Sequence, residues 1–430
     1  MYRKLFSKDF TLVVIGQIIS LFGNAVVRFA LPLYLLNLTG SPALYGTVMA
    51  CACVPAVLLS PIGGIVADRV NKRNIMVILD FLTAAVILTF FLLRSGGDLI
   101  LLLTVTLMLL YGIAGAYQPS VQASIPALVD REHSMAANSV INTVSSFASL
   151  TGPVLGGVLY STYGLEPVLG ICAVCFVLSA VMEIFIEIPF HRRASSGSII
   201  KTAGTDFAES IRFIRREKPV IGKVLLVVCG INLFLSAMIV VALPCLITEV
   251  LVFEPAQANR FYGFAEGALA AGGLAGGIGA GIWGRRLPVQ KAGNLLIVCA
   301  VCVFPIGIVL FLFSSALINY IVLTACCFLV MIFSTIFTVQ MLSFIQTETP
   351  QHLVGKVIAV CMTISMCAQP LGNALYGILF EICAGAEYAV VLFSGTVSLA
   401  VAAGAGNIFR GFSAEQLQGR PKGKEDGKAE

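Results

Sequence analysis

Long apolar segments recur along the whole chain, and they constrain its fold more than any other feature of the sequence. Segments such as 81–93 and 321–333 are apolar on nearly every side. A helix that crosses the hydrocarbon core of a membrane needs about 20 mainly apolar residues, because lipid offers the backbone no hydrogen-bond partner. A transmembrane β-barrel would instead show strands of about 10 residues in which apolar and polar side chains alternate. The pattern therefore predicts an all-α membrane protein.

The composition also indicates a chain that lies mostly in lipid. Of the 430 residues, 58% are hydrophobic and only 11% are charged, whereas about a quarter of the residues in a soluble domain are charged. The first apolar segment is too long for the apolar region of a signal peptide, so we expect it to be the first helix. The sequence predicts twelve transmembrane helices, at 10–36, 42–66, 74–94, 99–120, 136–162, 166–188, 221–248, 261–283, 290–313, 317–345, 355–381 and 386–409.

The distribution of lysine and arginine predicts how the chain is oriented in the membrane. An even number of helices places both termini on one side, and loops rich in Lys and Arg remain in the cytoplasm. With the N-terminus inside, all of the 27 basic residues except Arg28, Arg94 and Arg260 fall on cytoplasmic loops or helix ends. We therefore expect a multi-pass protein of the bacterial plasma (inner) membrane with both termini in the cytoplasm.

The same pattern predicts two six-helix bundles related by pseudo-two-fold symmetry. A Gln-x-x-x-Pro sequence at 122–126 recurs at 346–350, in the equivalent part of the second half, as expected after a duplication. The predicted parts are an N-terminal bundle at 1–190, a cytoplasmic linker at 191–219, a C-terminal bundle at 220–410 and a disordered tail at 411–430.

Within the linker, residues 206–218 show the spacing of an amphipathic helix. Apolar residues such as Phe207, Ile211 and Ile214 repeat at helical spacing, opposite charged residues, and Asp206 is placed to cap the first turn. We expect this helix to lie on the inner surface of the membrane.

The segment between the second and third predicted helices carries a family pattern, Gly64-Ile-Val-Ala-Asp68-Arg69-Val-Asn-Lys72-Arg73. It resembles the G-x-x-x-D-R-x-x-R/K-R signature of the major facilitator superfamily of membrane transporters. The resemblance implies that the acid and the flanking cations form charge-assisted bonds, which hold an inner gate closed and break when the carrier changes state.

A second pattern lies in the fifth predicted helix, Gly152-Pro153-Val-Leu-Gly156-Gly157. It resembles the G-P-x-x-G-G core of the motif found in antiporters of the same superfamily, in which proline kinks the helix and glycines allow close packing. The chain departs from the longer motif at Ser139 and Ala148, and it has no counterpart within 99–118 of the arginine that the family carries in its fourth helix.

Three further places resemble the macrolide-efflux branch of bacterial drug exporters: the segment 346–357, the Tyr117-Gln-Pro sequence and Asn138. This resemblance, with the motif in the fifth helix, implies export of an organic compound. Plain helix packing could also explain the glycine motifs, because small residues are common wherever membrane helices meet.

Four ionisable residues fall within predicted spans, where an ionised side chain costs on the order of 3 kcal/mol or more. These coupling candidates are Glu266, Arg28, Asp80 and Glu183. We hypothesise that Glu266 takes part in proton coupling, with Arg28 as a candidate charge partner. Asp80 is expected to have a structural role, paired with the nearby basic cluster or with a neighbouring helix. Glu183 is expected to reach toward the inner interface.

Uncharged polar residues also recur at helical spacing and indicate a water-filled central pathway. Hydrogen bonds that merely join helices, worth about 0.6–2 kcal/mol each, explain them equally well. The cavity candidates are Gln17, Asn24, Gln118, Gln122, Asn142, Asn232, Gln340, Gln369 and Asn373. Because they lie among apolar residues such as Phe234, Met238 and Phe337, with few charges, an amphipathic or weakly charged organic substrate is expected.

These observations predict a secondary active transporter that works by alternating access and exports an amphipathic compound in exchange for protons. Import of a small metabolite, or less plausibly a channel or a structural membrane protein, remains an alternative. An enzyme is not expected, because the three histidines lie at predicted loops and no hydrolase or phosphate-binding motif is present. The 13 cysteines lie mainly in apolar segments and predict neither metal nor redox chemistry. We expect a monomer with no cofactor, no metal and no nucleic-acid partner.

Overall fold

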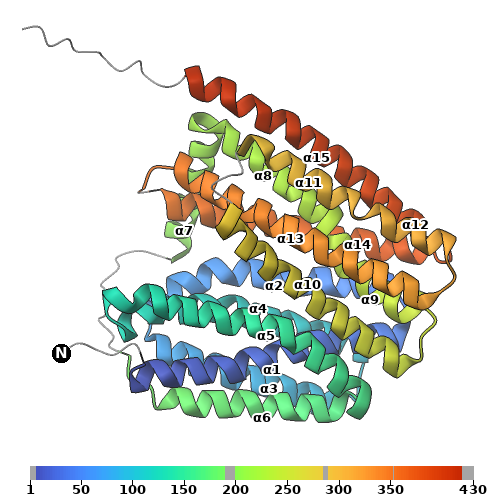
Figure 1. Ribbon diagram of the computed structural model, residues 1–430. Helices are drawn as coiled ribbons and strands as arrows, with labels where there is room; N and C mark the ends of the chain where they lie inside the picture. The colour runs from blue at the N-terminus through green and yellow to red at the C-terminus, as the bar shows by residue number, and fades with distance from the viewer. Residues whose placement is uncertain (1–5, 189–198, 284–288, 352, 419–430) are drawn as a thin grey trace, which may run out of the picture.

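A computed structural model describes residues 6–188, 199–283, 289–351 and 353–418, and every regular element within these ranges is a helix. The helices form two bundles, one from each half of the chain (Figure 1). The first turn of the first helix and the last turn of the last helix lie at the same end of the molecule, on the left in Figure 1. We call this the linker end, because the helix that joins the halves also lies there, and the opposite end the far end.

The N-terminal bundle contains six long helices whose apolar lengths follow the predicted spans. The elements are α1 (Lys8–Thr39), α2 (Pro42–Arg69), α3 (Lys72–Leu93), α4 (Leu99–Leu128), α5 (Ser134–Tyr163) and α6 (Leu165–Ile184). Helix α4 extends eight residues beyond its predicted end at 120, despite two internal prolines, because neighbouring helices can satisfy the backbone groups that proline leaves free. Helix α6 ends at Ile184 and not at 188, because the backbone then turns and buries Ile186 and Ile188 against the bundle.

The C-terminal bundle follows the same order, with more interrupted helices. Its elements are the continuous series α8 (Pro219–Ile231), η3 (Asn232–Ser236), α9 (Ala237–Cys245) and η4 (Leu246–Val250), then α10 (Pro255–Trp283), η6 (Val289–Lys291), α11 (Ala292–Val301), α12 (Phe304–Leu312), α13 (Ala316–Glu348), α14 (Val354–Ile382) and α15 (Glu387–Gln418). The helix predicted at 290–313 is divided at residues 302 and 303. Pro305 stands in the first turn of α12, where its missing N–H is tolerated.

Ten helical segments of the described chain are long and apolar enough to cross a membrane. Helices α5, of 30 residues, and α10, of 29 residues, are long enough to span but are not among these ten. Both are rich in small and polar residues, because they pack against each other and line the space between the halves. The prediction of twelve membrane-spanning helices therefore requires α5 and α10 to cross the membrane as well.

The linker contains a helix that differs from the predicted one. Helix α7 (Ile199–Arg212) continues into a π-helical turn, η2 (Phe213–Glu217), so Asp206 lies inside the helix and not at its cap. Phe213 and Ile214 are buried with Val357 of α14 and other residues of the C-terminal bundle. The last turns of the linker helix thus pack on protein, whereas Phe207 near its middle is exposed. Residues 191–198 of the predicted linker lie outside the described part of the chain.

The segment 411–430 was predicted to be disordered. Its first part is helical instead, because α15 continues to Gln418. A helix that has already formed adds residues at little cost, so a polar sequence can extend it without a core of its own. Residues 419–430 of the predicted tail lie outside the described residues.

Candidate substrate cavity and its closure

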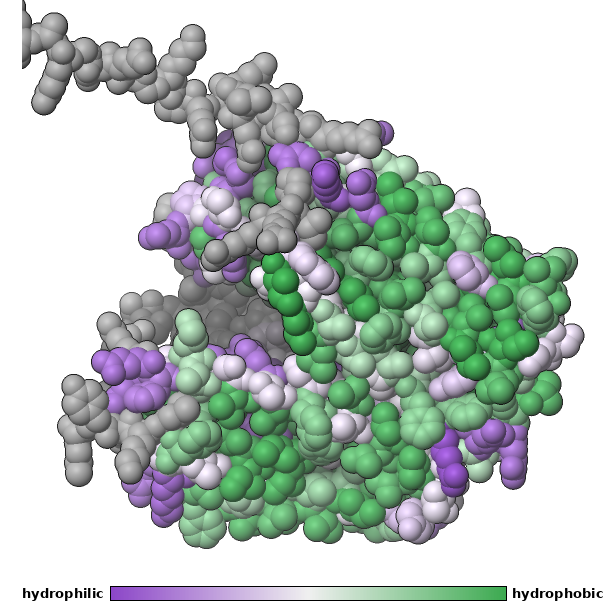
Figure 2. Space-filling model, viewed as in Figure 1, coloured by the Kyte–Doolittle hydropathy of each residue, from purple (hydrophilic) through white to green (hydrophobic). Residues whose placement is uncertain are grey.

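A cavity of about 750 Å³ lies between the two bundles. Helices α1, α2, α4 and α5 line it from the N-terminal half, and α9, α10 and α14 line it from the C-terminal half. Figure 2 shows the surface hollowed between the bundles on the side of the linker end. The volume lies within the range of about 300–1,000 Å³ that is usual for small-molecule sites.

The N-terminal half supplies most of the polar groups of the cavity. Asn24 of α1, Gln118 and Gln122 of α4, and Ser145 and Ser149 of α5 all line it. Amides and hydroxyls can donate and accept hydrogen bonds without a fixed charge. The wall can therefore bind a polar part of a ligand whatever the sign of its charge.

Two ionisable side chains also line the cavity, Arg28 of α1 and Glu266 of α10. The guanidinium carbon of Arg28 lies 3.7 Å from the ring centroid of Tyr111, which is a cation–π contact. Glu266 lies one helical turn after Tyr262 on α10, and both side chains line the cavity. The two residues share one cavity but form no ion pair among the described contacts. The predicted charge partnership is therefore absent in this conformation, because each side chain already has an aromatic neighbour.

Aromatic side chains close the cavity toward the far end. Tyr45 and Tyr262 are 2% and 5% exposed, and both line the cavity. Phe29 stacks on Tyr262 with ring centroids 4.8 Å apart. Because Tyr45 and Phe29 belong to one half and Tyr262 to the other, this layer can exist only while the halves are together at this end.

Closely packed glycines join the two halves beside the aromatic layer, where α2 meets α14 and α5 meets α10. A Cβ atom added to Gly46 would lie 2.3 Å from the carbonyl oxygen of Asn373, and one added to Gly263 would lie 2.6 Å from that of Pro153. Any residue larger than glycine would push the helices apart. We call these contacts the glycine seam.

The helix-5 motif lies directly on this seam. A Cβ atom on Gly157 would lie 3.1 Å from the Cα atom of Gly263 across the seam. Gly152 and Gly156 face α1 instead, and a Cβ atom there would approach the side chains of Ala25 at 2.3 Å and Phe29 at 3.0 Å. The motif therefore allows α5 to contact both α1 of its own half and α10 of the other.

Hydrogen bonds complete the closure at the far end. The Asn37 amide donates to Asn259 Oδ1 across the halves at 3.0 Å. Arg260 donates from Nε to Ser161 Oγ at 2.9 Å, and Ser41 donates to the carboxylate of Glu381. None of these contacts is an ion pair, so each can be exchanged for water when the halves separate.

The linker end is more open. A second hollow of about 700 Å³ is lined there by residues of α5 and by Leu274 of α10. The α5 residues include Asn138 and Asn142, both exposed. Asn142 thus lies between the halves, but in this hollow and not in the central cavity.

Several other cavity candidates lie elsewhere. Gln17 is fully buried inside the N-terminal bundle, where its amide donates to the hydroxyl of Tyr117 at 2.7 Å. Asn232 donates to the backbone carbonyl of Ser365 at 3.0 Å and so joins two elements of the C-terminal half. Helical spacing shows that residues share one face of a helix, but it does not show which neighbour that face contacts. Gln17 and Asn232 were therefore wrongly predicted to face the central cavity.

The remaining candidates of the C-terminal half also lie outside the lining of the central cavity. Gln340 is buried in α13, and Asn373 is 1% exposed beside the glycine seam. Gln369 of α14 is half-buried. Met238 and Phe337 belong to the apolar core of this half. The expectation that many second-half residues face the cavity was therefore wrong, and Met366, Val240, Tyr262 and Glu266 are its lining from that half.

Asp80 and Glu183 lie together in the N-terminal bundle, away from the central cavity. Glu183 is fully buried and accepts a hydrogen bond from Tyr117 at 2.8 Å, so it does not reach toward the interface as expected. Asp80 is 2% exposed and accepts a hydrogen bond from Ser20 of a neighbouring helix at 2.9 Å, one of the two pairings expected for it.

The loop motif at the linker end is only partly described. Gly64, Asp68 and Arg69 fall in the last part of α2, and their side chains lie outside the described part of the structure. Lys72 and Arg73 open α3 and are half-buried. The predicted role of this motif in an inner gate remains a prediction.

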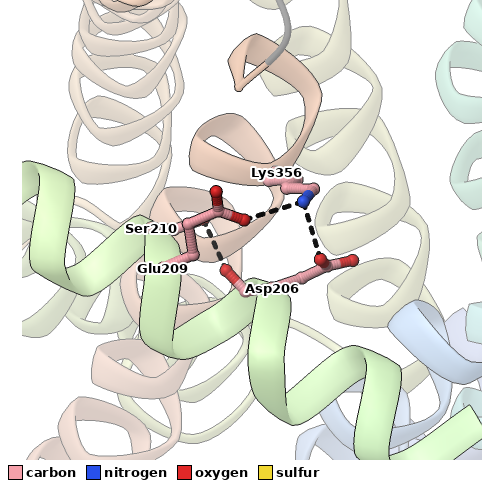
Figure 3. A network of polar contacts seen from close by, with 4 residues as sticks. All are labelled: Asp206, Glu209, Ser210 and Lys356. Carbon is pink, nitrogen blue, oxygen red and sulfur yellow. Dashed lines mark hydrogen bonds and ion pairs between the residues drawn. The ribbon is translucent and has the colours of Figure 1, made fainter.

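The linker helix is tied to the C-terminal half by an ionic cluster that the sequence did not suggest. Lys356 of α14 binds Asp206 Oδ1 and Glu209 Oε2 of α7, each at 2.8 Å (Figure 3). Ser210 donates to the backbone carbonyl of Asp206 in the same turn, at 2.8 Å. A further ion pair, Lys218 with Glu348, joins the end of the linker to α13 at 2.7 Å. Spacing of three along α7 could have indicated that the two acids share a face.

Comparison with known proteins gives a consistent result across the chain. The family model of the Major Facilitator Superfamily matches residues 13–373. The sequence is 23% identical over 385 residues to the multidrug efflux pump Tap of Mycobacterium tuberculosis, covering 86% of each chain. It is 23% identical over 396 residues to macrolide efflux protein A of Streptococcus pyogenes, covering 90% of this chain and 92% of the relative.

The fold is similar to that of solved transporters. The crystal structure of the POT family transporter PepTSo superposes with a TM-score of 0.72 at 13% identity, covering 95% of this chain and 99% of that one. At this identity the likeness concerns the arrangement of the helices and not the ligand.

Proposed function

The chain belongs to the major facilitator superfamily of membrane transporters, and we propose that it is a proton-coupled exporter of amphipathic organic compounds. One observation carries the proposal. A cavity of about 750 Å³ lies between two helix bundles that are joined at the far end and separated at the linker end. A site between two halves, closed on one side only, is what alternating access requires.

The orientation follows from the charges. Lysine and arginine are concentrated at the linker end, which we place in the cytoplasm. The cavity then faces the cytoplasm in this conformation, and α5 and α10 cross the membrane together with the ten more apolar spans. The glycine seam and the aromatic layer act as the outer gate. The protein works as a monomer in the lipid bilayer, because one chain supplies both halves of the cavity.

The lining supports an amphipathic substrate. Aromatic and aliphatic side chains such as Tyr111, Phe29 and Met49 offer apolar surface, and the amides of Gln118 and Gln122 offer hydrogen bonds. Arg28 and Glu266 supply one charge of each sign. This combination is suited to compounds with an apolar body and one polar or weakly charged group. The two similar proteins named for efflux support the same substrate class and the direction of export.

Glu266 is the carboxyl group that best fits proton coupling at the cavity. It lines the cavity on α10, so water can reach it from the cytoplasm in this conformation. It lies one helical turn from Tyr262, a member of the aromatic layer of the outer gate, on the same lining of the cavity. A proton bound by Glu266 therefore changes the charge of the cavity and the contacts of the gate at the same time.

The proposal is tested by measuring accumulation in bacterial cells with and without the protein. The probes are a fluorescent amphipathic cation and a macrolide, and a protonophore is added to collapse the proton gradient. We expect lower accumulation of at least one probe in cells that make the protein, and loss of this difference after the protonophore. Higher accumulation would instead indicate import, and a difference that survives the protonophore would refute proton coupling.

A further inference from the structure

A second polar site lies inside the N-terminal bundle, and the exporter mechanism described above makes no use of it. Its two acids are Asp80 of α3 and Glu183 of α6, which are 2% and 0% exposed. They belong to two helices, α3 and α6, that pack against each other. Neither lines the central cavity.

The neighbouring helices supply hydrogen-bond donors to one oxygen of each acid. Ser20 of α1 donates to Asp80 Oδ1 at 2.9 Å, and Tyr117 of α4 donates to Glu183 Oε1 at 2.8 Å. Gln17 of α1 donates in turn to the Tyr117 hydroxyl at 2.7 Å. The second oxygen of each acid, Asp80 Oδ2 and Glu183 Oε2, is buried without a hydrogen-bond partner, and so is Gln17 Oε1.

Among the described residues, no basic side chain contacts the two acids. The side chains that face them there are Gln17 and Ser20 from α1, Tyr117 from α4, and Ser179 from α6, none of which is cationic. The ion pairs of the described residues all lie elsewhere. Two buried carboxyl groups that share a site cannot both be ionised without a large cost, so such pairs hold a proton.

The surroundings favour a proton over a metal ion. The described residues contain no group of three or more His, Cys, Asp and Glu side chains that could hold a metal. Beside Asp80 there is a small cavity of about 20 Å³, which has room for roughly one water molecule. One water can carry a proton, whereas a coordinated cation would need more ligands and more space.

The small cavity adjoins the central one. Ser20, Asp80 and Tyr117 line it on the side of the acids. Four residues line both cavities and so form the wall between them: Leu21, Asn24, Ala114 and Gln118. Two members of this wall carry amide side chains that can hydrogen-bond to a water on either side. The wall belongs to α1 and α4, so any shift of these helices changes the connection.

We propose that Asp80 and Glu183 form a second proton site, which holds one proton between the two carboxyl groups and exchanges it with the central cavity through the small cavity. The proton leaves one carboxyl oxygen for the water in the small cavity, and the pair gains one negative charge. Tyr117 positions Glu183 within the site. The inference rests on the proposed proton coupling, to which it adds a site in the half opposite to Glu266.

The first test measures protonation without transport. Infrared spectra of the purified full chain in lipid nanodiscs are recorded at acidic and alkaline pH, in a Glu266→Gln background that removes the central carboxyl group. We expect a carboxylic-acid carbonyl band that disappears at alkaline pH. The band should shift in frequency or in the pH at which it disappears in Asp80→Asn and in Glu183→Gln, be lost when both substitutions are combined, and stay unchanged in Glu187→Gln, which alters an exposed acid just after the end of α6. A band that is unchanged in both single variants or survives the double substitution, or no band at all, would overturn the proposal.

A second variant covers the case in which removal of an acid prevents folding. Tyr117→Phe keeps both carboxyl groups but removes the hydrogen bond to Glu183, so it should move the frequency of the band and shift the pH at which the band disappears. If the spectrum and its pH dependence stayed unchanged, the band would not come from this pair. A pair that served only to hold the helices together would lower thermal stability when substituted but would leave no pH-dependent band.

Transport measurements distinguish failure of the second proton site from failure of the proposed function. Protons moved per substrate are measured in proteoliposomes for the wild type, Asp80→Asn, Glu183→Gln and Glu187→Gln. We expect the ratio or its pH profile to change in the first two variants only. If the wild type is coupled and neither variant differs from it, the second site is refuted and the exporter stands. If the wild type moves no protons, the proposed coupling fails, and the infrared band alone decides whether the pair binds a proton.

Discussion

Glu266 has a carboxyl group in the central cavity and a tyrosine hydroxyl as its polar neighbour. Replacing it by glutamine keeps the shape and removes the proton exchange. We expect Glu266→Gln to reduce gradient-driven export in proteoliposomes to the level of empty liposomes. Exchange of substrate without a gradient should continue, because glutamine keeps the shape of the cavity and resembles the protonated carboxyl group.

The matched control for this variant is Glu254→Gln, which alters an exposed acid just before α10. It should retain gradient-driven export. If Glu266→Gln transported as well as Glu254→Gln under a proton gradient, Glu266 would have no part in coupling.

The hydroxyl group of Tyr117 has two buried hydrogen-bond partners, Gln17 and Glu183. Tyr117→Phe leaves both of them short of a hydrogen bond, which typically costs about 1–3 kcal/mol. We expect a lower midpoint of thermal unfolding in detergent. Tyr163→Phe alters a tyrosine that is 63% exposed and should leave the midpoint unchanged. Equal midpoints for the two variants would show that the buried network does not stabilise the fold.

For single residues, the sequence predicted which ionisable side chains lie within the membrane but not which side chains they contact. The cost of burying charge singled out Asp80, Glu183 and Glu266, because so few ionisable residues occur within apolar segments. The partners could not be predicted. Tyr117 reaches Glu183 across 66 positions of the chain, and Tyr262 becomes part of a gate only when the halves meet.

The glycine seam is the place where helices of the two halves pack most closely at the far end. Gly46→Val places a side chain where the carbonyl of Asn373 already lies. Overpacking of this kind costs about 1–3 kcal/mol, which corresponds to a population shift of about 5–150-fold. We expect the variant to favour the conformation in which the halves separate at the far end.

This shift is measured by the distance between labels at Leu38 and Glu254, exposed positions at the far end in opposite halves. The labels are attached to unnatural amino acids, because the chain has 13 cysteines. Gly170→Val is the control, since nothing lies within 4 Å of a Cβ atom there. A distance distribution for Gly46→Val that matched the control would contradict the role of the seam as a gate.

The ionic cluster at Lys356 makes a separate prediction about α7. Lys356→Gln removes both ion pairs that join α14 to Asp206 and Glu209. We expect faster hydrogen exchange of the backbone amides in α7, because the two ion pairs that fix it to α14 are then lost. Lys223→Gln, which alters an exposed lysine of α8, is the control. Identical exchange in the two variants would mean that the ionic cluster does not hold the helix.

The helices themselves were largely predictable, since a membrane permits few alternatives to long apolar helices. The departures have local causes. Pro305 divides one predicted helix, and the contact of Phe213 and Ile214 with the C-terminal bundle draws the linker helix onto protein. Amphipathic spacing predicts a helix with one apolar face, but that face packs equally well on lipid or on a bundle.

For the whole molecule, the division into two halves could be predicted from the number and length of the apolar segments. The cavity between the halves could be predicted only in general terms. Its lining comes mainly from the N-terminal half, because Asn24, Gln118 and Gln122 turn toward it while Asn232 and Asn373 turn away. Sequence periodicity does not determine how far a helix is rotated about its axis, and so it does not show which face points toward the opposite half. That rotation is set by packing over the whole interface.

The central claim is that this molecule exchanges protons for an amphipathic compound across the membrane. The most direct measurement places the purified protein in liposomes with a pH-sensitive dye inside and imposes a proton gradient of either sign. We predict that substrate crosses the membrane in the direction opposite to the protons, and that reversing the proton gradient reverses the flow of substrate. The internal pH should change only when substrate is present. Substrate flow in the same direction as the protons, or flow that ignores the gradient, would contradict the account.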